Sequence, residues 1–155
     1  MASTPAFAST VKAWAAWVIA AGGTTQTATI TTAGLQATGN SRSGGGITVG
    51  VPTNSVSLMA AGATGSRIDE ITFTALTTSS ANIGRVFVYN GTNHYLYKEI
   101  AIPANTPSAS NPTASVTTTF NNLVIPSGSS IYVSVATMGT TTDGGYSVTA
   151  FGGDF

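Results

Sequence analysis

Residues 86–97 read VFVYNGTNHYLY and predict a β-hairpin. Two valines alternate with two aromatic residues at the start of this stretch, so each pair faces one side of a strand. Asn90-Gly91 follows, and both residues tolerate the positive φ that a two-residue primed turn requires. The returning strand runs from Tyr95 to Ile102 and ends at Pro103, which cannot donate a ladder hydrogen bond. The stretch therefore favours antiparallel pairing.

Short alternating runs of the same kind recur on both sides of the hairpin. Clusters of turn-forming residues separate them, as they do between the strands of antiparallel proteins. Together they make roughly nine strands, with no room for the crossover helices that parallel strands need. We therefore expect an all-β fold, an antiparallel sandwich of two sheets that resembles a jelly roll. The other expected strands lie at Thr24–Thr32, Ile47–Val51, Val56–Leu58, Ile71–Ala75, Val116–Phe120, Ile131–Val135 and Tyr146–Phe151.

Charged residues are unusually scarce in this chain. They make 6% of its 155 residues, whereas an ordinary globular protein carries roughly 25%. Hydrophobic residues make 42%, enough for the core of one domain, and the five basic and five acidic residues cancel. A free protein normally uses charge to remain soluble, so this composition favours a protein packed against neighbours, with a neutral soluble monomer as the alternative. Without a basic stripe, we expect no nucleic-acid partner.

Residues 13–21 read AWAAWVIAA and form an apolar run. The run is far shorter than the about 20 residues that span a bilayer, so we expect no membrane segment. A single basic residue precedes it and no cleavage motif follows, so we expect no signal peptide. A buried strand and a short helix both remain open, and a helix would put Trp14 and Trp17 on one face. We divide the chain into residues 1–22, an N-terminal arm or first strand, and residues 23–155, the sandwich domain.

The residue types that usually carry catalysis are few and scattered. The chain has no cysteine, so it forms neither a disulfide nor a cysteine-based metal site. His94, the one histidine, follows the hairpin turn, where solvent normally reaches it. Asp69 and Glu70 are adjacent and would point to opposite faces of a strand, which leaves glycoside hydrolysis a remote alternative. Calcium needs more carboxylates than the glycine turns at Asp143 and Asp154 offer. We expect no enzyme activity, no cofactor and no metal site.

Two tyrosines of the hairpin are candidate interface residues. By alternation, Tyr95 and Tyr97 share one face of the returning strand, opposite Leu96, Lys98 and Ile100. One face of a sandwich strand is core and the other is surface, so either the tyrosines or the aliphatic residues face outward. Exposed tyrosines serve protein interfaces and sugar-binding platforms, and ordinary core or rim packing is the alternative.

Several turns and core strands carry motifs: Ser3-Thr4-Pro5, GSRIDEI at 65–71, the hairpin at 86–97, Glu99-Ile100 with Pro103, LVIPSG at 123–128 and AFGGDF at 150–155. Together these motifs resemble small virion proteins of tailed bacteriophages, mainly over residues 62–155. They indicate the fold more than the role, and no functional residue is carried over from them. The Thr/Gly-rich stretch between Gly22 and Gly50 is longer than the resemblance leads us to expect.

The resemblance implies a structural virion protein. Its leading form is a capsid cement or decoration protein on the surface of the phage head, which clamps neighbouring capsomers and is often a trimer. The implied partners are the major capsid protein and further copies of this chain, as a homotrimer. Phe7, Trp14 and Trp17 of the N-terminal segment are the candidate contact arm, beside Tyr95 and Tyr97. The alternative is a tail or fibre component that binds a host glycan, with the tyrosine hairpin as the platform.

Overall fold

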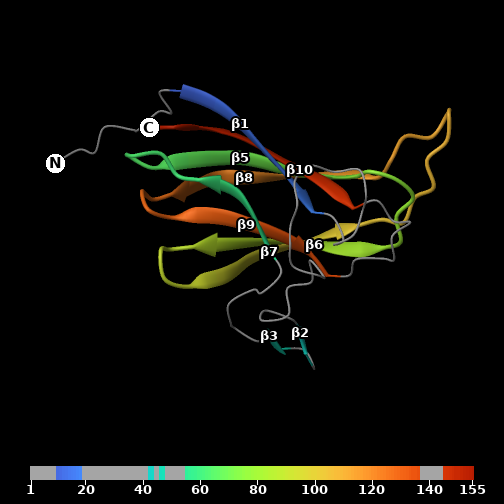
Figure 1. Cartoon of the computed structure of the whole chain (residues 1–155), viewed down its shortest axis with the longest axis horizontal. Coiled ribbons are helices and arrows are strands. Elements are labelled where there is room, and N and C mark those ends of the chain that lie inside the picture. The colour runs from blue at the N-terminus through green and yellow to red at the C-terminus, as the bar shows by residue number, and fades with distance from the viewer. Residues whose placement is uncertain (1–9, 19–41, 44–45, 48–54, 137–144) are drawn as a thin grey trace.

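The computed structural model describes residues 10–18, 42–43, 46–47, 55–136 and 145–155 (Figure 1). Within these ranges, the regular secondary structure is β-strand, without a helix. Two short strands, β2 (Arg42–Ser43) and β3 (Gly46–Ile47), pair with each other. Eight longer strands build the sandwich: β1 (Thr10–Val18), β4 (Val56–Ala60), β5 (Ser66–Ala75), β6 (Asn82–Tyr89), β7 (His94–Ile102), β8 (Ser115–Ile125), β9 (Ser130–Val135) and β10 (Tyr146–Asp154).

The eight long strands pair in a nested order. The first pairs with the last, β1 with β10, and β4 pairs with β9, β5 with β8 and β6 with β7, all antiparallel. Two further pairings, β10 with β5 and β9 with β6, complete sheet A, of order β1-β10-β5-β8, and sheet B, of order β4-β9-β6-β7. A chain that folds back on itself in nested pairs and rolls into two sheets is a jelly roll. The predicted all-β, two-sheet antiparallel fold is confirmed.

The core lies between sheets A and B. Alternate residues of each strand point inward, since side chains in a strand alternate between faces. Phe73 of β5 lies against Gly84 of β6, where a Cβ atom would come within 2.9 Å of the Phe73 ring. Burial of each large apolar side chain contributes about 1.5–3 kcal/mol. The buried inward residues include Val18, Ile68, Ile71, Val148 and Ala150 from sheet A, and Val86, Ile100, Ile131, Val133 and Val135 from sheet B.

The predicted hairpin is present, but its connection differs from the expected one. Residues 90–93 join β6 to β7, which is longer than a two-residue turn. Gly91 has a φ of 92°, whereas Asn90 does not have a positive φ. Instead, Asn90 Oδ1 accepts hydrogen bonds from the backbone N–H groups of Thr92 at 3.0 Å and Asn93 at 2.8 Å. The primed turn is therefore wrong, because the Asn90 side chain satisfies the turn backbone as in an Asx turn.

The N-terminal apolar run is a strand and not a helix. β1 pairs with β10 along its whole length without a register shift. Trp14 packs against the core, whereas Trp17 points outward, because the two residues have opposite positions in the alternation. The alternative with both tryptophans on one face of a helix is wrong. Of the two forms that we expected for residues 1–22, the structure shows the first strand, over residues 10–18.

Some sequence predictions fall outside the described residues. They are the strand at Thr24–Thr32, most of the strand at Ile47–Val51, Phe7 of the candidate arm and the turn residue Asp143. Ile47 itself belongs to β3, where it pairs with Arg42.

Candidate interface surfaces

The outer face of sheet A, here called the A face, is a continuous surface. The pairing registers align its outward residues in four rows, each with one residue from β1, β10, β5 and β8 in turn. Two of these rows carry no charge, so half of the face is neutral. The rows are Trp17, Ser147, Thr74 and Ser115; Ala15, Thr149, Thr72 and Thr117; Ala13, Phe151, Glu70 and Thr119; and Val11, Gly153, Arg67 and Val124.

Hydroxyl groups on the A face bond to one another. Thr72 Oγ1 lies 2.7 Å from Thr117 Oγ1, and Thr74 Oγ1 lies 3.0 Å from Ser115 Oγ. A polar group that is buried without a partner costs about 1–3 kcal/mol. Because these hydroxyl groups already have partners within the sheet, covering this face would cost fewer hydrogen bonds to water than covering a face whose hydroxyl groups have no partner.

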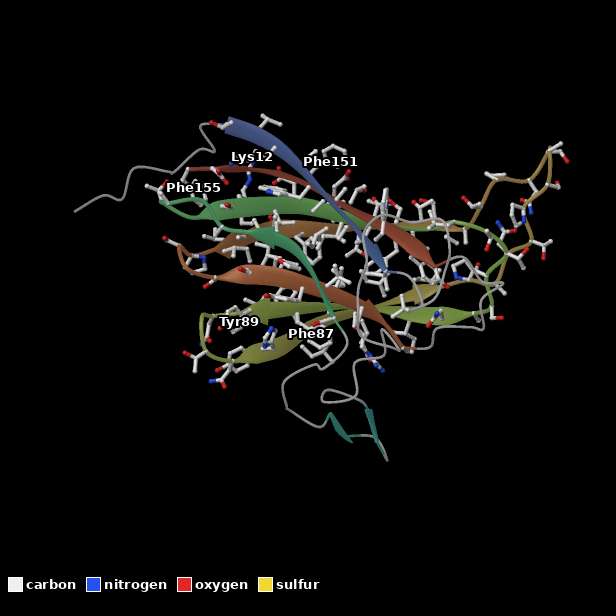
Figure 2. The ribbon with its side chains drawn as sticks, in the orientation of Figure 1. Lys12, Phe87, Tyr89, Phe151 and Phe155 are labelled. Atoms are coloured by element: carbon white, nitrogen blue, oxygen red, sulfur yellow. The ribbon has the colours of Figure 1, made fainter. Side chains whose placement is uncertain are left out.

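Four large apolar side chains project from the A face. Their exposed fractions are 86% for Val11, 38% for Trp17, 51% for Val124 and 47% for Phe151. Figure 2 labels Phe151 on the sheet A side of the sandwich. Trp17 is a sequence candidate, whereas sequence reasoning misses the other three. The alternation along residues 146–151 was the available signal, since it places Phe151 on the face opposite the buried Val148 and Ala150.

The charges of the A face lie at one end of it. Arg67 Nε forms an ion pair with Asp69 Oδ1 at 2.8 Å, and Glu70 follows in the same strand. Phe151 and Gly152 of β10 pair with Glu70 and Ile68, which makes Asp69 an extra residue in a bulge of β5 against β10. Ile68 and Ile71 are both buried in the core, so the two residues between them, Asp69 and Glu70, lie together on the outward side of β5. The expectation that Asp69 and Glu70 point to opposite faces is wrong.

Tyr95 and Tyr97 lie on β7, the edge strand of sheet B. Their exposed fractions are 47% and 49%. The ring centroid of Tyr97 lies 5.9 Å from that of Phe120 on β8, and Lys98 Nζ lies 5.6 Å from the Phe120 centroid. The last distance suits a cation–π contact. Tyr95, Tyr97 and Phe120, with Lys98 over the Phe120 ring, are here called the aromatic rim of β7 and β8.

A bulge changes the predicted faces of β7. The register between β6 and β7 shifts by one residue, which leaves Tyr97 as the extra residue. A bulge reverses the alternation beyond it. Lys98 and Ile100 therefore lie on the same side of β7 as Tyr95, and the prediction that they lie opposite is wrong. Ile100 is buried there, while Tyr95 at the other end of the strand is exposed.

The outer face of sheet B carries a second aromatic cluster, beside the hairpin. The ring centroids of Tyr89 and His94 lie 4.4 Å apart, and Tyr132 stands edge-on to both, at 5.9 Å and 4.8 Å. Burial lowers the pKa of His94. Figure 2 labels Tyr89 and the buried Phe87 on this side, away from Phe151. The arrangement places His94 among aromatic rings, whereas the histidine of a Ser-His-Asp triad lies between a serine hydroxyl and a carboxylate.

The C-terminal residues are tied to β1 and β5. The Asp154 carboxylate accepts hydrogen bonds from Lys12 Nζ and, at 2.6 Å, from Ser66 Oγ. The hydrogen bond from Lys12, followed by that from Ser66, lowers the pKa of Asp154. Thr64 Oγ1 donates to the Phe155 carbonyl oxygen at 2.5 Å. Asp154, expected as a turn residue, lies at the end of β10 and serves a structural contact.

Searches for other kinds of site concern the described ranges alone. There, no group of three or more His, Cys, Asp and Glu side chains could hold a metal ion. Within the same ranges, no helix is long and apolar enough to cross a membrane. Comparisons with protein-family models, curated proteins and solved structures find no match. The surfaces described above and the sequence motifs are therefore the grounds for a functional proposal.

Proposed function

We propose that this chain is a structural protein of a phage virion, a cement or decoration protein that stabilises the head shell. The observation that carries the proposal is the A face, which combines a neutral half, hydroxyl groups with partners inside the sheet, and exposed Val11, Trp17, Val124 and Phe151. Val11, Phe151 and Val124 lie in neighbouring rows of that face, and apolar side chains that gather on one face mark an interaction site. The motif resemblance to virion proteins supplies the identity of that partner, the major capsid protein.

The size of the A face is compatible with such a contact. Four strands spaced by about 4.8 Å set the width of the A face, and the four rows together cover about 24 Å along the strands, which gives roughly 450 Å² of flat area. Projecting side chains raise the accessible area above that value. A standard interface covers about 800 Å² on each partner, so the flat area of the A face alone makes up about half of what such a contact needs.

The charge pattern supports the same partner. Only five basic and five acidic residues are present in the whole chain, and the net charge is zero. Contacts without charge gain little from electrostatic steering and lose little to salt. A protein held in many copies on a shell needs tight packing more than fast capture, and the A face has the apolar side chains for it.

The aromatic rim favours a second candidate function, host-glycan binding by a tail or fibre component. Tyr97 is half exposed beside Phe120, Tyr95 is half exposed on the same strand, and aromatic rings of this kind can stack on the apolar face of a sugar ring. Asn121 and Asn122 follow Phe120 in β8 and are exposed, so amide groups for sugar hydroxyls lie nearby.

Copy number in the particle separates the two candidates. We expect quantitative gel electrophoresis of purified virions to give this chain on the order of hundreds of copies, near the number of capsid subunits, because a shell repeats its contacts by symmetry. A handful of copies per particle would contradict the cement role and favour the tail component. Absence of the chain from purified virions would contradict both.

A further inference from the structure

We propose that β1 is a self-association edge, which pairs antiparallel with β1 of a second copy of this chain. The contact would join two copies of sheet A into one continuous sheet about a two-fold axis at Trp14. This inference does not rest on the virion role, since it concerns the isolated protein in solution, and it joins two copies where the resemblance to virion proteins implies three.

The edge of β1 has few of the features that normally prevent such pairing. Among the described strands, β1 pairs only with β10, and in Figure 1 it forms a border of sheet A. Natural proteins protect exposed edges with proline, bulges, short strands or charges. β1 has nine residues, no proline and no register shift. Its one charged side chain, Lys12, is bound to Asp154.

Geometry selects one register for the pairing. A two-fold axis that continues the sheet keeps the outer face of each copy on the same side. Residues that pair must therefore both point outward or both point inward. An axis at Trp14 meets this condition and pairs every residue of β1. Thr10 then lies opposite the second copy's Val18, and Trp14 lies opposite the second copy's Trp14. Axes at other residues leave part of the strand without a partner.

The side chains are self-complementary in this register. On the outer face, Val11 would lie opposite the second copy's Trp17, and both are exposed in the single chain. Pairs of aromatic and β-branched residues stabilise neighbouring strands. Ala13 would lie opposite the second copy's Ala15, where the small side chains leave the backbones free to approach.

Charge does not oppose the contact. Lys12 would lie opposite the second copy's Ala16, and the two Lys12 side chains would stand about 13 Å apart along the strand. That separation exceeds the screening length of about 8 Å at physiological ionic strength. A contact one strand wide falls below about 1,200 Å² in total, which is typical of transient complexes, so we expect reversible association.

Sedimentation velocity of the purified chain tests the proposal, from about 1 μM to about 1 mM, the range in which weak complexes form. We expect the average mass to rise from that of one chain toward that of two. A13K/A15K should remain monomeric throughout, because each ammonium group would face another across the axis. A13E/A15K should associate at least as well as the unmodified chain, because opposite charges would then face each other.

A matched control carries the same charge on the opposite edge of the A face. T117K/T119K on β8 changes two exposed outward residues and should associate like the unmodified chain. The proposal is overturned by an unmodified chain that stays monomeric, by a mass of three chains, by A13K/A15K that still associates, or by a control that loses association.

Cross-linking provides a second measurement, which does not need the lysine variants to fold. The chain has no cysteine, so A13C and A15C each introduce a single thiol. With copper phenanthroline as the oxidant of the two thiols, a mixture of A13C and A15C should form disulfide-linked dimers severalfold faster than either protein alone. Equal rates in the mixture and in the separate proteins would contradict the register at Trp14.

Discussion

Gly152 lies where the backbone of β10 closely approaches the backbone of β5. A Cβ atom at this position would stand 1.9 Å from the Arg67 carbonyl oxygen, and that oxygen belongs to a paired strand that cannot move aside alone. We expect Gly152→Ala to lower the free energy of unfolding by about 3 kcal/mol or to prevent folding. Chemical denaturation measures the effect.

The control for this substitution lies on the same strand. Thr149→Ala removes a methyl and a hydroxyl group from the outward face, and we expect it to change the free energy of unfolding by less than about 0.5 kcal/mol. If Gly152→Ala were as stable as Thr149→Ala, the close approach of β10 to β5 would be wrong.

Asp154 makes the stability depend on pH at the acidic end. Its pKa is lowered in the folded protein by Lys12 and then by Ser66. A lowered pKa means that the unfolded chain binds the proton more readily, so the stabilisation is present above the ordinary pKa of 3.8 and is lost as the pH falls through the folded value. We expect Asp154→Asn to be less stable than the unmodified protein at pH 7, with the difference shrinking below about pH 4. Denaturation curves at pH 7 and pH 3 measure this, and a constant difference would contradict it.

At the scale of the element, the contacts of β1 are those of a sandwich strand and not those of a detachable arm. Val18 is buried, Trp14 packs on the core, and the whole strand pairs with β10. Deleting residues 1–20 should therefore abolish cooperative thermal unfolding, because it removes core side chains and exposes the ladder of β10. Such a loss approaches the whole stability of an ordinary domain, about 5–15 kcal/mol.

A shorter deletion provides the comparison. Removing residues 1–9 leaves β1 complete, and we expect the midpoint of thermal unfolding to stay within a few degrees of the full chain. A folded, cooperative protein after the deletion of residues 1–20 would show that the segment is an arm after all.

Alternation along the chain predicts most strands, but it cannot predict where alternation fails. The bulges at Asp69 and Tyr97 each add one residue, and each reverses the faces that the sequence pattern assigns. The run in β1 is ambiguous for a different reason. Trp14 and Trp17 fit a helix face at a spacing of three, and only pairing with β10, distant in the sequence, selects the strand.

At the scale of the molecule, the nested order of pairs lies beyond a reading of local pattern. The hairpin of β6 and β7 is its only pair between strands that are neighbours in the sequence, and the other three pairs join strands that are progressively farther apart. The A face depends on this order, since its rows combine residues from both ends of the chain. Sequence reasoning therefore finds Trp17 as a candidate but not the surface to which it belongs.

The central claim is that the A face, with its neutral half and its exposed apolar side chains, holds this chain on a phage head. The direct test is the binding of purified protein to heads that lack it, at salt concentrations from about 50 mM to about 500 mM, which spans weak to strong screening. We predict binding that changes little with salt and falls by at least tenfold in W17S/F151S, with I83S, another exposed apolar residue, as the control that binds normally. Undetectable binding, binding that weakens steeply with salt, or full binding by W17S/F151S would contradict the claim.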